Sequence, residues 1–323
     1  MTGFWVGSYT ASMGGDASGI GWAVTASDGS LEYRGAAAEA SSPSFLAHGA
    51  GDILYAVDEA AGRVEAYGVV GEGMLEPLGG RATSGAAPCH ISVTPSHVFV
   101  SNYTGGTADR FALNPDGTIG DLLDTLHGTG SGPHAAQDGP HLHATLVVGG
   151  GVLSADLGSD RVREQRPAGD HLELAAETDF PAGTGPRDLL RSGDDVFLLG
   201  ELNGGLFRLG EHGAIQASGE VVADWVSGDH AAALAEHRGY LYTGLRGSNR
   251  IAAARRADLA PAFAIPTGGD WPRHLVIADD ILHVANQLSS TVTSFRLDPA
   301  TGIPTPLGAP SPVPSPTYLL PAR

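Results

Sequence analysis

The sequence predicts an all-β protein, folded as a seven-bladed β-propeller with four antiparallel strands in each blade. Three observations lead to this prediction. A unit of roughly 40 to 50 residues recurs along the chain. Each copy pairs a proline-led apolar run with a second apolar run that ends in a polar residue, and no stretch shows the apolar spacing of an amphipathic helix. We therefore expect one propeller domain over residues 1–323.

Six copies of the unit follow one another along the chain. Their first and second runs are residues 43–46 with 53–58, 88–91 with 98–102, 140–143 with 152–156, 186–189 with 196–201, a degenerate copy starting at His230 with 240–245, and 272–275 with 281–286. A third short strand follows in each unit, as at residues 63–67 and 291–295, and a weaker fourth strand completes it. Short runs of this kind are typical of propeller blades rather than of helical repeats.

The seventh copy is divided between the two ends of the chain. Residues 316–319 form a proline-led run with no second run after it, and residues 4–8 form a second run with no first run before it. We expect the C-terminal strand to pair with the N-terminal strands, because closing the ring removes the free edges of the sheets. Both ends of the chain then belong to the fold.

The composition agrees with many short strands. The 47 glycines and 21 prolines supply positive-φ and strand-ending positions, and 42% of the residues are hydrophobic. We find neither a basic and apolar leader nor an apolar stretch of about 20 residues, so we expect a soluble, cytoplasmic protein with no membrane partner. The single cysteine, Cys89, excludes an internal disulfide bond.

The charge of the chain narrows the choice of partner. A net charge of −18 repels nucleic acids and anionic membranes over most of the surface, so we expect neither as a partner. We expect a monomer or weak homo-oligomer that acts on a small molecule. Basic residues that gather in one place on so acidic a protein would mark the site where that molecule binds.

Propeller geometry brings such residues together. The start of strand one and the end of strand two of each blade lie at the same rim of the central channel. The candidate residues at or beside these positions are His90, Asn102, Tyr103, His141, His143, Asp156, Arg187, Glu201, Arg246, Arg273 and His274. Arginines, histidines and carboxylates from different blades are the composition of a pocket for an anionic substrate with acid–base groups beside it.

Several of these motifs resemble one known family. The runs are residues 87–92 (APCHIS), 101–103 (SNY), 139–143 (GPHLH), 183–187 (GTGPR), 200–203 (GELN) and 272–275 (PRHL). Together they resemble the propeller-type 6-phosphogluconolactonases, a family that includes the fungal 3-carboxymuconate lactonizing enzyme. The resemblance spans the whole chain. It departs from the family pattern at Asp188, where these enzymes usually have histidine, and this change puts a negative charge beside Arg187.

The resemblance implies a function and a set of site residues. It implies hydrolysis of a sugar lactone, most simply 6-phosphogluconolactone in the pentose phosphate pathway, without a metal or organic cofactor. The family's functional histidine, arginine, glutamate and second arginine fall on His143 or His141, Arg187, Glu201, and Arg246 or Arg273. His143, with His141 as the alternate, would be the base, and Glu201 would orient the histidine or an arginine. Other substrate-binding contacts would come from His90, Asn102, Tyr103, Asp156 and His274.

Two other functions stay open from the sequence. A carboxymuconate-type cyclase would use the same arginines to bind several carboxylates, and a non-enzymatic ligand-binding or scaffold propeller would use them as ties between blades. A zinc site at His141 and His143 is disfavoured because no third ligand has a convincing spacing.

Overall fold

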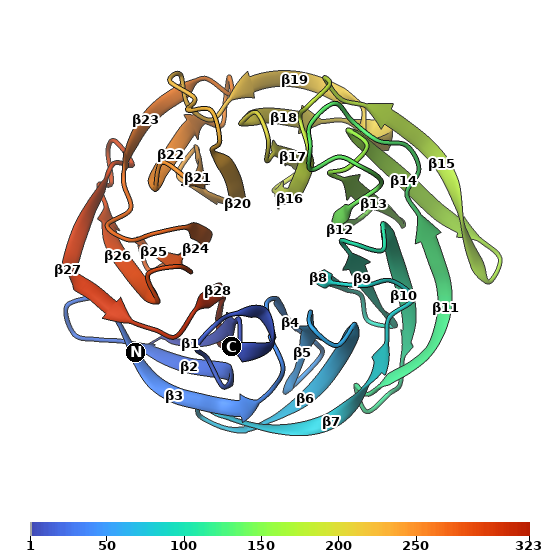
Figure 1. The fold of residues 1–323 in the computed structure, drawn as a ribbon, viewed down its shortest axis with the longest axis horizontal. Coiled ribbons are helices and arrows are strands. Elements are labelled where there is room, and N and C mark those ends of the chain that lie inside the picture. The colour runs from blue at the N-terminus through green and yellow to red at the C-terminus, as the bar shows by residue number, and fades with distance from the viewer. Residues whose placement is uncertain (1) are drawn as a thin grey trace.

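Seven four-stranded antiparallel sheets surround a central axis in the computed structural model, which describes residues 2–323 (Figure 1). This arrangement confirms the predicted seven-bladed propeller. The first strand of each blade lies nearest the axis and the fourth lies at the rim (Figure 1). Two single-turn 3₁₀ helices, η1 (Ala11–Met13) and η2 (Glu211–Gly213), complete the described secondary structure, and no helix in residues 2–323 is long and apolar enough to cross a membrane.

The blades are numbered from the N-terminus, and their strands are given from the axis outward. Blade one contains β28 (Pro316–Pro321), β1 (Gly3–Ser8), β2 (Gly19–Thr25) and β3 (Leu31–Glu39); blade two contains β4 (Leu46–His48), β5 (Ile53–Asp58), β6 (Arg63–Gly71) and β7 (Met74–Ala82). Blade three contains β8 (Pro88–Val93), β9 (His97–Asn102), β10 (Thr107–Leu113) and β11 (Ile119–His127); blade four contains β12 (Leu142–Val148), β13 (Gly151–Asp156), β14 (Arg161–Ala168) and β15 (His171–Asp179).

The remaining three blades follow the same pattern. Blade five contains β16 (Pro186–Ser192), β17 (Asp195–Gly200), β18 (Gly205–Leu209) and β19 (Ile215–Glu220); blade six contains β20 (His230–His237), β21 (Tyr240–Arg246), β22 (Arg250–Arg255) and β23 (Pro261–Pro266). Blade seven contains β24 (Pro272–Ala278), β25 (Ile281–Asn286), β26 (Thr291–Leu297) and β27 (Pro304–Pro312).

The hydrophobic core is divided into layers between neighbouring blades. Alternate side chains of a strand point to opposite faces of its sheet, so each blade packs one apolar face on each neighbour. Between blades two and three, for example, Tyr55 and Val64 pack in one cluster with Val98 and Phe111, and all four are at most 1% exposed. Burying one such side chain contributes about 1.5–3 kcal/mol, so the ring is held together by many apolar contacts of similar strength.

The ring closes in blade one, as the divided seventh repeat predicts. β28 pairs antiparallel with β1, where Trp5 lies opposite Leu320, and the sheet continues into β2 and β3. The backbone N–H of Ala322 donates to the carbonyl of Gly3 at 2.8 Å, so the two ends of the chain lie side by side. The Arg323 guanidinium donates to the carbonyl of Gly49 at 2.7 Å, which ties the last residue to blade two.

A one-residue bulge recurs at the start of five innermost strands; the bulge in β28 leaves Thr317 out of the pairing, and the other four supply charged and polar side chains of the site. At each of these four bulges the register of the innermost strand against the second strand of its blade shifts by one residue. The shifts lie between Pro88 and His90 in β8, Leu142 and Ala144 in β12, Pro186 and Asp188 in β16, and Pro272 and His274 in β24. The residues left out of the pairing are Cys89, His143, Arg187 and Arg273. A bulge re-aims the side chain of its extra residue, and these four side chains line the central cavity.

The bulge corrects the sequence alignment in blade four. The sequence places Pro140 at the start of strand one, and therefore His141 in the position after the proline. In the structure β12 begins at Leu142, which pairs with Asp156 as Pro88 pairs with Asn102 in blade three. The N–H of His141 instead donates to the Asp156 carboxylate at 2.8 Å, so this segment stays outside the strand pairing. His143 is therefore the equivalent of Arg187 and Arg273.

A second correction concerns the end of strand two. The sequence places Glu201 at that end, whereas β17 stops at Gly200, which pairs with Pro186. Glu201 is thus one residue beyond the strand. The backbone N–H of Glu201 donates to the carbonyl of Gly185, as that of Tyr103 donates to Ala87. Tyr9 and Gln287 make the same contact with the residue before the innermost strand of their own blades, and Glu59 makes it with Ser42, the residue before Pro43.

Removal of the closing strand tests the role of the chain ends. A variant that lacks residues 316–323 should unfold at a much lower temperature, or without a cooperative transition, because β1 loses its inner partner and the buried Phe4 and Trp5 lose their cover. Calorimetry or circular dichroism as a function of temperature measures this.

Two leucines provide a matched pair for the same test. Leu319→Ala, at a side chain only 1% exposed in β28, should cost about 2–5 kcal/mol of unfolding free energy. Leu288→Ala, at a side chain 59% exposed, should stay within about 0.5 kcal/mol of the parent. A truncated chain that melts like the full chain would show that β28 does not hold the ring closed.

Candidate active site

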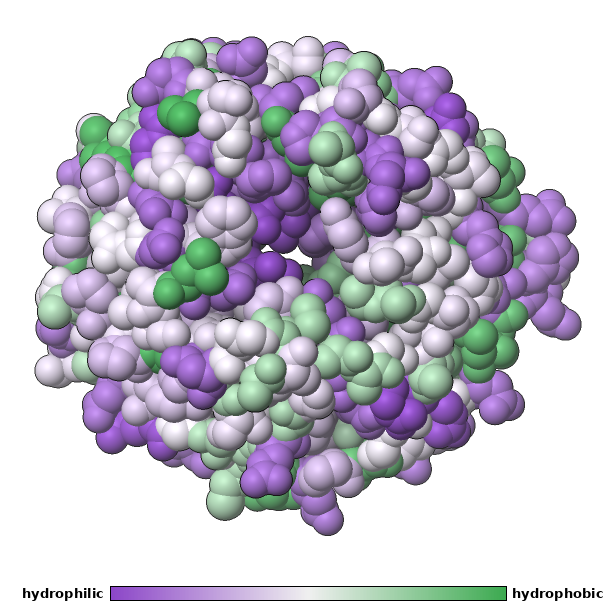
Figure 2. All heavy atoms as spheres, in the orientation of Figure 1, coloured by the Kyte–Doolittle hydropathy of each residue, from purple (hydrophilic) through white to green (hydrophobic). Residues whose placement is uncertain are grey.

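The candidate site is a cavity of about 200 Å³ on the central axis of the propeller. Its walls come from the innermost strands, and the residues that line it are Ser44, Phe45, Cys89, His90, His143, Arg187, Asp188, Leu189, Leu190, Ala233, Leu234, Arg273, His274, Thr317 and Tyr318. Figure 2 shows a narrow opening at the centre of the disc, bordered in part by hydrophilic residues. Five of the residues predicted from the sequence reach this cavity: His90, His143, Arg187, Arg273 and His274.

A buried carboxylate links three basic side chains at one side of the cavity. Glu201 Oε2 forms ion pairs with Arg187 Nη1 and, at 2.8 Å, with Arg246 Nη2. Its other oxygen, Oε1, lies 3.0 Å from His230 Nδ1. Burial opposes the charge of Glu201, but Arg246 and Arg187 together hold its pKa well below the usual range. Glu201 therefore stays ionised and fixes the positions of both guanidinium groups.

Arg273 has a different environment on the other side of the cavity. Its guanidinium lies 4.8 Å from the centre of the Tyr9 ring, and its Nη1 donates to Gln287 Oε1 at 3.3 Å. The nearby Glu59 accepts hydrogen bonds from the Tyr9 hydroxyl, at 3.0 Å, and from the Ser44 hydroxyl. Within residues 2–323, Arg273 forms no ion pair with a carboxylate. Its charge is therefore available to an anionic ligand.

His143 projects into the cavity as a neutral ring. Burial and the positive charge of Arg187 lower its pKa well below 6.5, although Glu201 opposes the shift. No hydrogen bond to its ring nitrogens is found among residues 2–323. The ring stands edge-on to Tyr103, with centroids 6.0 Å apart. At neutral pH one nitrogen of His143 is thus free to accept a proton.

His141, the alternative base, is held outside the cavity lining. Its ring stacks on Tyr103, with centroids 4.4 Å apart and an interplanar angle of 11°. Nδ1 lies 2.9 Å from the Tyr103 carbonyl and Nε2 lies 3.0 Å from Asp138 Oδ1. Both ring nitrogens therefore have partners within the protein, and the bulge places His143, not His141, at the cavity.

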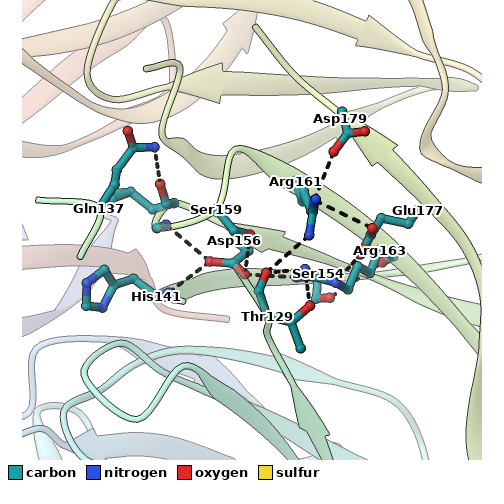
Figure 3. A network of polar contacts seen from close by, with 12 residues as sticks. Thr129, Gln137, His141, Ser154, Asp156, Ser159, Arg161, Arg163, Glu177 and Asp179 are labelled. Carbon is teal, nitrogen blue, oxygen red and sulfur yellow. Dashed lines mark hydrogen bonds and ion pairs between the residues drawn. The ribbon is translucent and has the colours of Figure 1, made fainter. Parts of the chain in front are cut away.

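Two predicted binding residues lie inside their blades rather than at the cavity. Asp156 accepts hydrogen bonds from the N–H of His141 and from Ser159 Oγ, at 2.6 Å, and forms an ion pair with Arg163 at 2.8 Å (Figure 3). Asn102 donates to Thr107 Oγ1 at 3.0 Å and to Asp109 at 3.1 Å. Both side chains are fully buried. The polar network of Asp156 supports the segment that leads into β12.

Cys89 occupies the bulge of blade three but stays a thiol. Burial raises its pKa to about 12, so the thiolate that a nucleophile requires is absent at neutral pH. Its Sγ lies 3.5 Å from the carbonyl of His143 in the next blade. We therefore assign Cys89 to packing between blades.

His90 and His274 lie one residue beyond the bulge and share one hydrogen-bond pattern. Nδ1 of His90 accepts from the N–H of Thr145 at 3.4 Å, and Nδ1 of His274 accepts from the N–H of Leu319 at 3.2 Å. A ring nitrogen that accepts carries no proton, so the proton of each neutral ring is on Nε2. Burial lowers the pKa of each ring to about 3, so both stay neutral at physiological pH.

Sequence reasoning missed His230 as a site residue. It takes the proline position of blade six, and its contact with Glu201 depends on the spacing of blades five and six, which no local pattern contains. The ring of Trp271, which lies 5.6 Å below the guanidinium of Arg246, was missed for the same reason. Tyr9 and Glu59 had a visible signal, because both follow a second strand as Tyr103 and Glu201 do.

The described residues contain no cluster suited to a metal. Among residues 2–323, no group of three or more histidine, cysteine, aspartate or glutamate side chains is arranged to hold a metal ion. His141 and His143, the pair considered from the sequence, differ in environment, since both nitrogens of His141 already have partners.

Known proteins resemble this chain in sequence and in fold over almost its full length. The model of the family described as lactonase, 7-bladed beta-propeller, matches residues 3–321. The 6-phosphogluconolactonase of Bacillus subtilis is 26% identical over 337 residues, which cover 96% of each chain. A solved structure from Lactobacillus plantarum is 27% identical, with a TM-score of 0.91 and 100% of both chains covered. The periplasmic gluconolactonase of Pseudomonas aeruginosa, at 24% identity, shares the fold with a TM-score of 0.91 over 100% of this chain and 99% of its own.

The neutral histidines predict how stability depends on pH. His90 and His274 have folded-state pKa values of about 3, whereas an unfolded histidine titrates near 6.5. The unfolded state therefore binds more protons as the pH falls below about 6.5, and the free energy of unfolding should decrease from there towards pH 3. Urea denaturation at a series of pH values measures the slope.

Substitution of one histidine isolates its share of this slope. His274→Asn keeps an acceptor for the N–H of Leu319 but cannot titrate, so the slope should decrease by up to about 1.4 kcal/mol per pH unit. His171→Asn, at an exposed side chain on β15, should leave the slope unchanged. An unchanged slope in the His274 variant would contradict a neutral, buried ring at that position.

Proposed function

Because the chain belongs to the lactonase family of seven-bladed β-propellers, we propose that it hydrolyses a sugar lactone in the central cavity. The observation that supports this most is the convergence of the neutral His143 ring with Arg187 and Arg273 at one cavity. 6-Phosphogluconolactone is the first substrate to test, because the relative from Bacillus subtilis is a 6-phosphogluconolactonase.

The reaction begins with the attack of water on the lactone carbonyl. His143 accepts a proton from the water as its oxygen bonds to the carbonyl carbon, and negative charge develops on the carbonyl oxygen. Arg187, held in place by Glu201, faces this oxyanion and stabilises it. The same negative charge raises the basicity of the His143 ring, which compensates for the low pKa that burial imposes in the free protein.

The second half of the reaction opens the ring. The bond between the carbonyl carbon and the ring oxygen breaks, and the leaving alkoxide takes the proton held by His143. The products are the free sugar acid and the regenerated neutral histidine. No electrons are transferred, and the activated ester requires no covalent intermediate. Arg273, which forms no ion pair within residues 2–323, binds the anionic group of the substrate.

A carboxymuconate-type cyclase is the second candidate. Arg187 and Arg273 line the cavity, and Glu201 joins Arg246 to Arg187; a substrate with several carboxylates would require several arginines of this kind. Glu201 pairs with Arg187 and Arg246, whereas Arg273 forms no ion pair within residues 2–323, and this favours a substrate with a single anionic group. Separate assays of substrate depletion with 6-phosphogluconolactone and with carboxymuconate distinguish the two reactions.

Substitution of the proposed base and the proposed oxyanion ligand tests the mechanism. His143→Ala and Arg187→Ala should each lower lactone hydrolysis by at least ~10², with little change in melting temperature. The double variant should lose much less than the product of the two effects, because both residues act in one step. Steady-state kinetics with 6-phosphogluconolactone measures these effects.

Matched controls come from exposed positions on outer strands. His127→Ala on β11 and Arg255→Ala on β22 remove the same side chains far from the cavity and should leave the rate unchanged. Variants of His143 and Arg187 that lose stability instead of activity would favour the scaffold function, with these residues as ties between blades. Full activity in both would contradict their assignment as catalytic residues.

Chelation tests the cofactor proposal. We expect hydrolysis to persist after exhaustive dialysis against EDTA, because the proposed step needs only a base and guanidinium groups. Elemental analysis should find no stoichiometric metal in the purified protein. Loss of activity that returns on addition of one divalent ion would overturn the cofactor-free mechanism.

A further inference from the structure

The cavity has a second layer of side chains, which lie one residue after the bulge in β8, β16, β24 and β28 and at Phe45 in blade two. This inner ring consists of Phe45, His90, Asp188, His274 and Tyr318. We propose that the inner ring is a subsite for the uncharged, hydroxyl-bearing part of a sugar ring, with Asp188 as the residue that accepts its hydroxyl protons. The proposal deepens the lactonase function and rests on it.

Four consecutive blades supply a continuous aromatic wall to this subsite. The rings of His274 and Tyr318 have centroids 4.0 Å apart, those of Tyr318 and Phe45 4.1 Å, and those of Phe45 and His90 4.4 Å. All four residues line the cavity. An aromatic surface suits the C–H face of a sugar ring, which is apolar, while its hydroxyl groups point to the sides.

The two histidines of the wall present hydrogen-bond donors. Since the Nδ1 atoms of His90 and His274 accept backbone N–H groups, each ring carries its proton on Nε2. Neither Nε2–H, nor the hydroxyl of Tyr318, has a hydrogen-bond partner in the part of the chain that the structure describes. These three groups are therefore available to a ligand in the cavity.

Asp188 accepts a backbone N–H from the next blade, as His90 and His274 do. Unlike the two histidines, it offers the cavity a hydrogen-bond acceptor instead of a donor. Its Oδ2 accepts the N–H of Leu234 in blade six at 2.8 Å, as His90 accepts that of Thr145 in blade four. Its Oδ1 accepts the N–H of Leu189 at 3.0 Å and keeps a lone pair for a ligand. Where the histidines place N–H donors, Asp188 thus places a carboxylate at the cavity wall.

This pattern matches hydroxyl groups better than a phosphate. A hydroxyl group donates and accepts, so it satisfies Asp188 and a histidine Nε2–H together. A phosphate only accepts, and its charge would be repelled by the Asp188 carboxylate. Arg273, whose guanidinium forms no ion pair within residues 2–323, lies in the layer of the bulge. A phosphorylated lactone would therefore place its phosphate beside Arg273 and its hydroxyl groups in the inner ring.

Three lactones and one isosteric substitution test the subsite. Asp188→Asn keeps an acceptor for the N–H of Leu234 but removes the charge. It should lower kcat/KM for glucono-δ-lactone and for 6-phosphogluconolactone by a similar factor, about tenfold to a hundredfold. δ-Valerolactone has the same ester ring without hydroxyl groups, and its hydrolysis should not change. Asp179→Asn, at an exposed side chain on β15, is the matched control and should alter none of the three.

The outcomes separate this proposal from a purely structural role of Asp188. An equal loss with all three lactones, or no loss with any, would overturn the subsite. Arg273→Met should lower kcat/KM for the phosphorylated lactone much more than for glucono-δ-lactone, and equal losses would contradict the proposed orientation.

A wild-type protein that hydrolyses none of these lactones would refute the proposed function instead. In that case, binding of the neutral polyol 1,5-anhydroglucitol tests the subsite by saturation-transfer NMR. The signal should appear with the wild type and disappear with Asp188→Asn. Its absence in the wild type, or its presence in both, would overturn the subsite independently of catalysis.

Discussion

The geometry of the site depends on a one-residue bulge at the start of the innermost strands. A regular strand would direct alternate side chains into the contacts between blades, where charged groups are costly to bury. The bulge frees one residue per strand from this alternation, so His143, Arg187 and Arg273 line the axis while their neighbours stay in the sheet. The proposed catalytic side chains from separate blades thus meet without any change in the packing of the ring.

Electrostatic balance lets so many charges lie close together. Glu201 joins Arg187, Arg246 and His230, and without it two guanidinium groups would be buried with no countercharge. Because Glu201 extends from the end of β17 while its partners come from the innermost strand of its own blade and from blade six, the carboxylate also fixes the relative positions of two blades. The same ion pairs therefore serve the packing of the blades and the function proposed for Arg187.

The sequence was sufficient for the fold and for part of the site. The repeat, the divided blade and the arginines of the proline motifs are local patterns, and the structure confirms the ring that they predict. Register was harder, because the hydrogen bond from His141 to Asp156 moves the start of β12 by two residues. The contact of His230 with Glu201 joins two blades through space, so no spacing in the sequence contains it. Asn102 and Asp156 look like rim residues in the repeat, but their hydrogen bonds lie inside the blades.

The closing blade also sets the order of assembly during synthesis. β1 leaves the ribosome first, yet its inner partner β28 is made last, so an apolar strand edge with Phe4, Trp5 and Val6 stays unpaired until about 310 residues have followed. Contacts so distant in sequence form slowly and leave partly folded chains open to association with one another. Among the strand pairs within residues 2–323, the pair of β1 with β28 joins the segments that lie farthest apart in the sequence, so closure of blade one must wait for residues 316–321.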